Sequence, residues 1–223
     1  MYALDSHGMK TVAIISQKGG AGKTTLAVHI GVAAARLGMI SAIIDLDPQG
    51  TARSWASRRR EEGPEVVGDH ASQLPALLAA AEKNGAALVV IDTAPNADQA
   101  ALAAARAADL ILIPCRPAAF DLEAIKTTLD LAQIAKKPAF VVLNAVPVRS
   151  KIGDEAAAGL KGQGAQVAPT YLSHRAAYGH AVIDGRTAQE YEAGGKADQE
   201  VDTLFQWVCG HVGLSTSRHR KAS

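Results

Sequence analysis

Short runs of apolar residues alternate along this chain with stretches in which apolar residues recur every three or four positions. An uninterrupted apolar run is typical of a strand that is buried on both faces, and the wider spacing is typical of a helix with one buried face. The runs predict strands over residues 11–15, 39–46, 65–67, 86–92, 110–114, 139–144 and 166–172. The alternation therefore predicts an α/β fold in which helices connect the strands.

The first helix is predicted after the first strand, and its apolar residues are Leu26, Ile30, Ala33 and Leu37. Gly38 stands where this helix is expected to stop. Further helices are predicted over residues 51–60, 72–83, 98–108, 151–163 and 196–211, and one has a buried face at Leu122, Ile125, Leu129 and Ala132. Because parallel strands need helical crossovers, we expect a doubly wound, mainly parallel sheet with helices on both faces.

Residues 9–212 are expected to form a single domain, because 223 residues suit one α/β unit and no linker interrupts them. Residues 1–8 are expected to be a disordered leader, or Met9 is the natural start, and residues 213–223 are expected to be a disordered polar tail. Only residues 1–10 precede the first strand, so we expect no separate DNA-reading domain there.

Composition limits the kinds of partner and the cell compartment that we expect for this protein. The net charge is +1, so any nucleic-acid binding depends on a local basic patch, and aromatic residues at 4% argue against a base-stacking platform. The two cysteines form no C-x-x-C motif, which argues against a disulfide framework or a structural zinc site. The sequence has no apolar run of membrane-spanning length and no signal peptide, so we expect a cytoplasmic protein.

The stretch Ser16–Thr25 has the arrangement of a phosphate cradle. It follows an apolar strand, contains three glycines and precedes a helix, so backbone N–H groups are expected to converge on a phosphate. Lys23 is expected to reach the β- and γ-phosphates, and the Thr24 hydroxyl is expected to bind Mg²⁺. ATP and Mg²⁺ are the expected cofactors. The expected nucleotide-binding residues in this stretch are Lys18, Gly19, Gly20, Ala21, Gly22, Lys23, Thr24 and Thr25.

Polar residues also stand at the carboxyl ends of other predicted strands, where ligands of parallel sheets bind. These residues are Asp45, Asp47, Asp92, Cys115, Arg116 and Asn144. Asp92 is placed to hold Mg²⁺ through water, although a strand-terminal aspartate can instead cap the next loop. Asp45 and Asp47 are two residues apart and are expected to point to the same side, where they suit water positioning and metal binding or form a solvated acidic turn.

The cradle K-G-G-x-G-K-T-T has Gln17 where the common P-loop pattern has its first glycine, and it adds Lys18. It resembles the deviant Walker A box of the ParA/MinD family of P-loop ATPases, and D-x-D-P-Q at residues 45–49 resembles that family's Walker A′ motif. The resemblance implies that Lys18 reaches the partner's nucleotide in an ATP-dependent homodimer and that Asn144 reads the adenine edge. It further implies that Lys18, Lys23 and Asp47 are catalytic and that Thr24, Asp45 and Asp92 surround the metal.

The segment from Ser173 to Gly185 resembles a late segment of the small ParA-type partition proteins. By this resemblance we expect weak intrinsic ATPase activity, non-specific binding to double-stranded DNA, a ParB-type centromere-binding adaptor and a location at the nucleoid. The candidate DNA-binding residues are Arg149, Lys151, Lys161, Arg175 and Arg186, with residues 58–60 as a rival cluster.

Two alternatives stay open. A MinD-like positioning ATPase is expected to carry an apolar membrane-binding helix at its end, and residues 213–217 have no such face. A small-molecule ATP-dependent enzyme on the same fold needs an additional polar substrate pocket, for which the sequence offers no evident residues. We therefore expect no membrane partner and favour a DNA-segregating ATPase.

Overall fold

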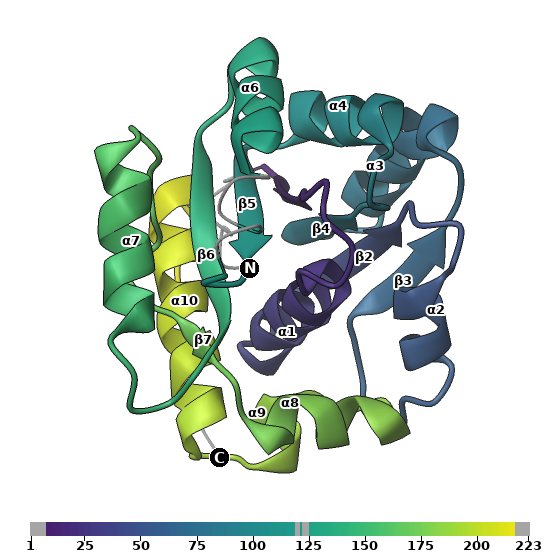
Figure 1. The fold of residues 1–223 in the computed structure, drawn as a ribbon. Helices are drawn as coiled ribbons and strands as arrows, with labels where there is room; N and C mark the ends of the chain where they lie inside the picture. The colour runs from purple at the N-terminus through teal and green to yellow at the C-terminus, as the bar shows by residue number, and fades with distance from the viewer. Residues whose placement is uncertain (1–7, 119–120, 122–124, 217–223) are drawn as a thin grey trace.

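A parallel β-sheet forms the centre of the computed structural model, which describes residues 8–118, 121 and 125–216 (Figure 1). In the described residues the sheet has seven strands in the order β3-β2-β4-β1-β5-β6-β7, and all the pairings between neighbours are parallel. The strands are β1 (Lys10–Ile14), β2 (Ser41–Asp45), β3 (Glu65–Gly68), β4 (Leu88–Asp92), β5 (Leu110–Cys115), β6 (Ala139–Val146) and β7 (Leu172–Ser173). The predicted α/β class and the parallel sheet are confirmed.

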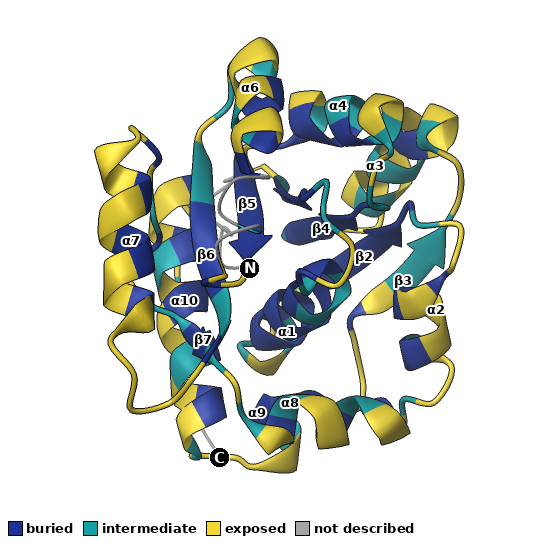
Figure 2. Ribbon diagram, viewed as in Figure 1, coloured by how far each residue is buried: buried dark blue, intermediate teal, exposed yellow. Residues whose placement is uncertain are grey.

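Helices cover both faces of this sheet. One face packs against α3 (Leu74–Lys83), α4 (Asp98–Ala107), α6 (Ile125–Ala135) and α7 (Ile152–Gly162). The other face packs against α1 (Lys23–Arg36), α2 (Thr51–Ala56) and α10 (Lys196–Val212). Figure 2 shows the central strands β2, β4 and β5, together with most of α1, as buried. The apolar runs of the sequence therefore became the two-sided core, as expected of parallel strands.

A layer of short helices adjoins α1 and α10 and was not predicted from the sequence. It consists of α8 (Ala176–Ala181), the 3₁₀ turn η2 (Val182–Asp184) and α9 (Ala188–Tyr191), which lie along one side of the molecule in Figure 1. A capping box begins α9: Glu190 Oε2 accepts the backbone N–H of Thr187 at 2.8 Å, and the Thr187 side chain caps the helix in return.

Three predicted elements differ from the structure. The late strand over residues 166–172 is reduced to β7, with Val167 making a single bridge to Val141, because Pro169 interrupts the segment and has no N–H to donate. The helix over residues 51–60 ends at Ala56, since Arg59 turns inward to pair with Glu190. The helix over residues 72–83 opens with a 3₁₀ turn, η1 (Ala71–Gln73).

Some predictions fall outside the described residues. The expected leader lies there except for Gly8, the expected tail except for residues 213–216, and Leu122 of the predicted helix face also lies there. The helices in the described part of the chain do not combine the length and apolar composition that a bilayer crossing needs.

Candidate nucleotide-binding site

The cradle lies at the carboxyl end of β1, in the middle of the sheet, and leads directly into α1. Gly22 is the residue before α1 and has a φ of 98°, in the left-handed region that favours glycine. A Cβ atom on Gly22 would lie 1.9 Å from the amide nitrogen of Asn144, which is far inside van der Waals contact. The turn therefore requires glycine here both for its backbone angle and for its packing.

A cavity of about 700 Å³ opens beside this cradle. Its lining comes from the cradle, the segment after β2, the loop after β5, the carboxyl end of β6, and the segment from β7 through α8. Its polar and cradle lining includes Gly19, Gly20, Gly22, Lys23, Thr24, Thr25, Asp47, Arg116, Asn144, Ser173, His174, Arg175, Tyr178 and His180. The volume is in the range of small-molecule and cofactor pockets.

Lys23 is buried at the start of α1 and is held within the cradle. Its ammonium group donates a hydrogen bond to the carbonyl oxygen of Lys18 at 3.1 Å. Burial lowers the pKa of Lys23, and the carboxylates of Asp92 and Asp47 oppose this shift. A buried ammonium facing two carboxylates is fixed where a phosphate is expected.

Asp92 ends β4 and is completely buried, directly across from Asp45 on β2. Neither of its carboxylate oxygens accepts a well-formed hydrogen bond. Burial raises the pKa of Asp92 to about 7, and the nearby Thr24 hydroxyl and Lys23 offset part of this rise. A buried carboxylate without a partner is costly, so its position beside Thr24 fits a Mg²⁺ ion that would satisfy it.

The chemistry of the donor set also fits Mg²⁺. Among the described residues, no group of three or more His, Cys, Asp or Glu side chains could enclose a metal by itself. Mg²⁺ in phosphate-binding proteins typically uses one or two protein oxygens together with waters and phosphate oxygens. The Thr24 hydroxyl and the Asp92 carboxylate are oxygen donors of the kind that such a partial shell needs.

Asp45 and Asp47 have different surroundings in the structure. Asp45 is fully buried, and its two oxygens accept the backbone N–H groups of Asp47 and Arg53, each at 3.1 Å. Asp45 therefore closes the turn after β2 and caps the first turn of α2. Asp47 lines the cavity, and one of its oxygens accepts the N–H of Gln49 at 2.9 Å. The assignment of Asp45 to the metal stays a prediction.

Lys18 forms an ion pair with Asp121 of its own chain. The side chain of Lys18 is 40% exposed and that of Asp121 is 10% exposed. Lys18 is therefore held by an acid of its own subunit. Its expected contact with the nucleotide of a partner subunit stays a prediction.

Asn144 lies near the carboxyl end of β6 and contacts the cradle. Its amide nitrogen donates to the carbonyl oxygen of Ala21 at 2.9 Å, and its amide oxygen accepts the N–H of Ala145 at 2.8 Å. One end of the amide thus supports the cradle, and the other supports the irregular backbone between Asn144 and Val146 within β6. Asn144 also lines the cavity, so its predicted contact with adenine stays open.

Four of the candidate DNA-binding residues fall into two groups. Arg175 lines the cavity and donates from Nε and Nη2 to Glu200 of α10 at 2.9 and 2.7 Å, so its charge is already balanced. Arg186 pairs with Asp184 at 2.7 Å. Arg149 and Lys151 are exposed in the turn between β6 and α7, and within the described residues neither has a salt-bridge partner.

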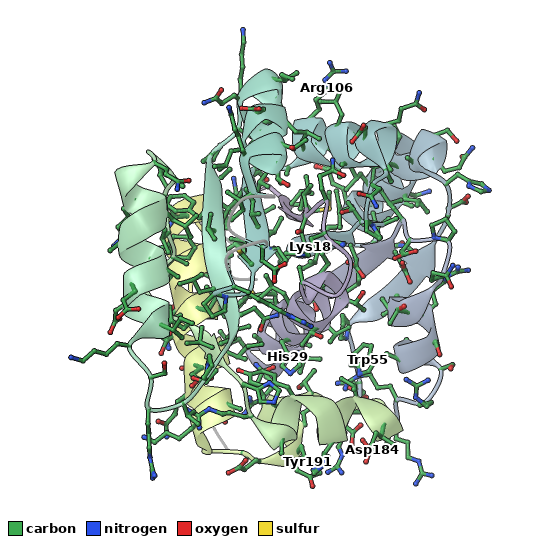
Figure 3. The ribbon with its side chains drawn as sticks, viewed as in Figure 1. Lys18, His29, Trp55, Arg106, Asp184 and Tyr191 are labelled. Carbon is green, nitrogen blue, oxygen red and sulfur yellow. The ribbon has the colours of Figure 1, made fainter. Side chains whose placement is uncertain are left out.

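The layer of short helices, α8 to α9, contacts both α1, which follows the cradle, and α2, which follows the D-x-D-P-Q motif. On α1, the Nε2 atom of His29 accepts the N–H of Ala188 at 3.0 Å. On α2, the indole N–H of Trp55 donates to the carbonyl oxygen of Arg186 at 3.0 Å. Figure 3 shows both side chains lying toward the α8–α9 layer.

A second link joins this layer to the segment after α2. Arg59 donates from Nη1 and Nη2 to Glu190 at 2.8 and 2.6 Å, and its guanidinium lies 5.1 Å from the ring centre of Trp55. Together, the two links place the layer as a brace between α1 and α2.

The strand-terminal cradle, its buried lysine and the unpartnered carboxylate define a P-loop nucleotide-binding protein. Residues 12–187 match the family model described as the CobQ/CobB/MinD/ParA nucleotide binding domain, and the chain belongs to that family.

Known proteins of this family resemble the chain over most of its length. It is 34% identical over 200 residues to the maintenance of carboxysome distribution protein A of Gloeobacter kilaueensis, covering 86% of this chain and 90% of the relative. It is 30% identical over 146 residues to the chromosome-partitioning ATPase Soj of Thermus thermophilus, covering 52% of this chain and 59% of Soj. The solved ATP complex of a Cyanothece McdA variant superposes with a TM-score of 0.75 at 19% identity, covering 93% of this chain and 97% of that one. These matches confirm the family and fold that the sequence predicted.

Proposed function

We propose that this protein is a ParA/MinD-type positioning ATPase that uses ATP to control its association with a partner subunit and with DNA. Two ATP-bound subunits associate, the dimer binds double-stranded DNA without sequence preference, and an adaptor protein stimulates hydrolysis and release. The observation that carries the proposal is Asp92, a fully buried carboxylate without a hydrogen-bond partner beside Thr24 and Lys23. Such a carboxylate is explained by a metal-bound nucleotide.

The residues around the cavity divide the work of hydrolysis. The cradle N–H groups and Lys23 bind the phosphate chain, while Thr24 and Asp92 would hold Mg²⁺, which would neutralise charge on the phosphates. Asp47 lines the cavity without being buried in the sheet, and we assign it to orienting the attacking water. Lys18 leaves Asp121 and adds a positive charge at the partner's nucleotide.

Two kinds of cargo are consistent with this cycle. The relative from Gloeobacter kilaueensis is named for the maintenance of carboxysome distribution, which favours a protein assembly as the object that this protein positions. The likeness to Soj favours the second candidate, chromosome or plasmid segregation with a ParB-type adaptor. Arg149 and Lys151, exposed and without an acidic partner among the described residues, are the better DNA-binding candidates, because Glu200 and Asp184 balance the other two arginines.

The nucleotide step is tested by two substitutions. Lys23→Ala is expected to abolish Mg-ATP binding, measured with a fluorescent ATP analogue. Asp47→Ala is expected to retain ATP and to accumulate an ATP-bound dimer, measured by light scattering. Unchanged ATP affinity and turnover in Lys23→Ala would contradict the cradle, and an ATP-loaded but monomeric Asp47→Ala would contradict the role of Asp47.

The output is tested by mobility shift with unrelated DNA duplexes in the presence of ATP or ADP. We expect binding with ATP alone, and a steep loss of binding as salt is raised, because phosphate contacts release counterions. Arg149→Ala combined with Lys151→Ala is expected to weaken this binding while ATP affinity stays unchanged. No binding with either nucleotide would remove DNA from the proposal, and turnover that depends on a metabolite would favour a small-molecule enzyme.

A further inference from the structure

Arg116 follows β5 and lines the cavity where it borders the cradle. Strand β5 pairs with β1 in parallel, and the N–H of Ile15 donates to the carbonyl oxygen of Leu112 at 3.0 Å. The loop after β5 therefore lies directly beside the cradle. Arg116 lines the same cavity as Gly19, Gly20 and Lys23.

The side chain of Arg116 extends over the cradle because the cradle has no side chain at that point. Its Nη2 atom lies 3.7 Å from the position that a Cβ atom on Gly20 would occupy. Gly20 is exposed and has a φ of 71°, so its backbone faces the open cavity. The guanidinium is thus close to the backbone groups that are expected to surround the phosphates.

The backbone of Arg116 is firmly placed, while its side chain has no acidic partner in the part of the chain that the structure describes. Cys115 and Pro117 on either side are buried, and the Cys115 thiol donates to the carbonyl oxygen of Arg116 at 3.3 Å. Arg116 itself is exposed, and in the described residues its guanidinium has no acidic partner.

Two other cations near the cavity have acidic partners. Lys18 is paired with Asp121, and Arg175 is paired with Glu200. A guanidinium that has no acidic partner and faces a cavity built for phosphates is suited to a bidentate contact with phosphate oxygens.

We propose that Arg116 binds the phosphate chain of the nucleotide held by its own subunit. This inference rests on the proposed ATP binding and adds a residue to that site. The contact acts in cis, in contrast to the one proposed for Lys18. Arg116 then contributes to nucleotide affinity in the monomer, before any partner subunit arrives.

The test measures the affinity of the full-length protein for fluorescent ATP and ADP analogues with Mg²⁺, at protein concentrations that keep it monomeric. Arg116→Gln removes the charge, Arg116→Lys keeps it without the planar fork, and Arg106→Gln is the matched control. Arg106 is an exposed arginine at the end of α4, well separated from Lys18 in Figure 3. Thermal unfolding checks that all variants are folded.

We expect Arg116→Gln to weaken ATP binding about tenfold, Arg116→Lys to weaken it less, and Arg106→Gln to leave it unchanged. The difference between Arg116→Gln and the wild type is expected to shrink as salt is raised, because the contact is ionic and exposed. A loss for ATP alone places the contact at the terminal phosphate, and a loss for both nucleotides places it at the phosphate nearer the sugar.

Two results would overturn the proposal. The first is that Arg116→Gln and the control have the same monomer affinity for both nucleotides. Alternatively, monomer affinity stays intact and only ATP-dependent dimerisation is lost, which assigns Arg116 to the subunit interface. If the wild type itself binds no ATP, the proposed function fails, which is a separate outcome from failure of Arg116 alone.

Discussion

The buried His29 predicts a specific loss of stability in mild acid. The side chain is fully buried between α1 and α9. Because Nε2 accepts the N–H of Ala188, the ring proton resides on Nδ1, which donates to the carbonyl oxygen of Thr25 at 2.6 Å. Both bonds are made by the neutral ring. Protonation at Nε2 would break the bond to Ala188 and place a charge in the core.

The magnitude follows from the pKa of His29. Burial lowers it from 6.5 to about 4, with the Thr25 carbonyl and the charge of Glu190 opposing part of the shift. The unfolded chain binds the proton at a higher pH than the folded one, so stability is complete above about pH 6.5 and falls as the pH drops toward about 4. A shift of about 2.5 units corresponds to about 3 kcal/mol, a large part of the 5–15 kcal/mol typical of a domain.

The assay is urea unfolding of the wild type and of His29→Gln from about pH 7.5 to about pH 4.5. Carboxylates titrate in both proteins and cancel in the difference between their free energies of unfolding. His29→Gln is expected to be less stable near neutrality, because its amide fits the two hydrogen bonds less well. The wild type should lose most of about 3 kcal/mol relative to the variant as the pH falls. A difference that stays constant over this range would refute the neutral, buried state of His29.

Three other outcomes are expected. Gly22→Ala should abolish ATP binding in a folded protein, measured by nucleotide titration, because the added Cβ meets the amide of Asn144; normal affinity would contradict the tight packing. Asp121→Asn should free Lys18 and strengthen ATP-dependent dimerisation about threefold to tenfold in sedimentation experiments, because a partly exposed ion pair contributes only a small free energy. Weaker association in this variant would contradict the inference that Asp121 holds Lys18 in the monomer. Both cysteines are buried, and burial raises the pKa of each thiol to about 12, so the native protein should resist iodoacetamide at about pH 8 and react when unfolded in urea.

The part of the fold that local sequence determines was predictable. Strand β1, the cradle and α1 are contiguous, so apolar runs, glycines and helical spacing were enough to place them. The convergence of Asp47, Asp92 and Asn144 was also predictable, because parallel strands bring their carboxyl ends to one edge.

The brace formed by α8 and α9 was not predicted, since its helices are too short to show a periodic apolar face. One signal was present: Thr187 and Glu190 have the spacing of a capping box, which marks a helix start. The partners of Arg175 and Lys18 had no such signal. Glu200 lies 25 residues from Arg175, and which acid each cation meets depends on the assembled fold.

The pair formed by Arg59 and Glu190 has a consequence for how this protein can change over generations. The two side chains are 131 residues apart in the chain, yet they are only 5% and 14% exposed and make two hydrogen bonds to each other. Replacing one of the two leaves the other as a nearly buried charge without an ionic partner. This destabilises the folded protein more than replacing both by apolar residues. The two positions are therefore expected to mutate together among relatives, and an aligned set in which they vary independently would show that other contacts hold the brace.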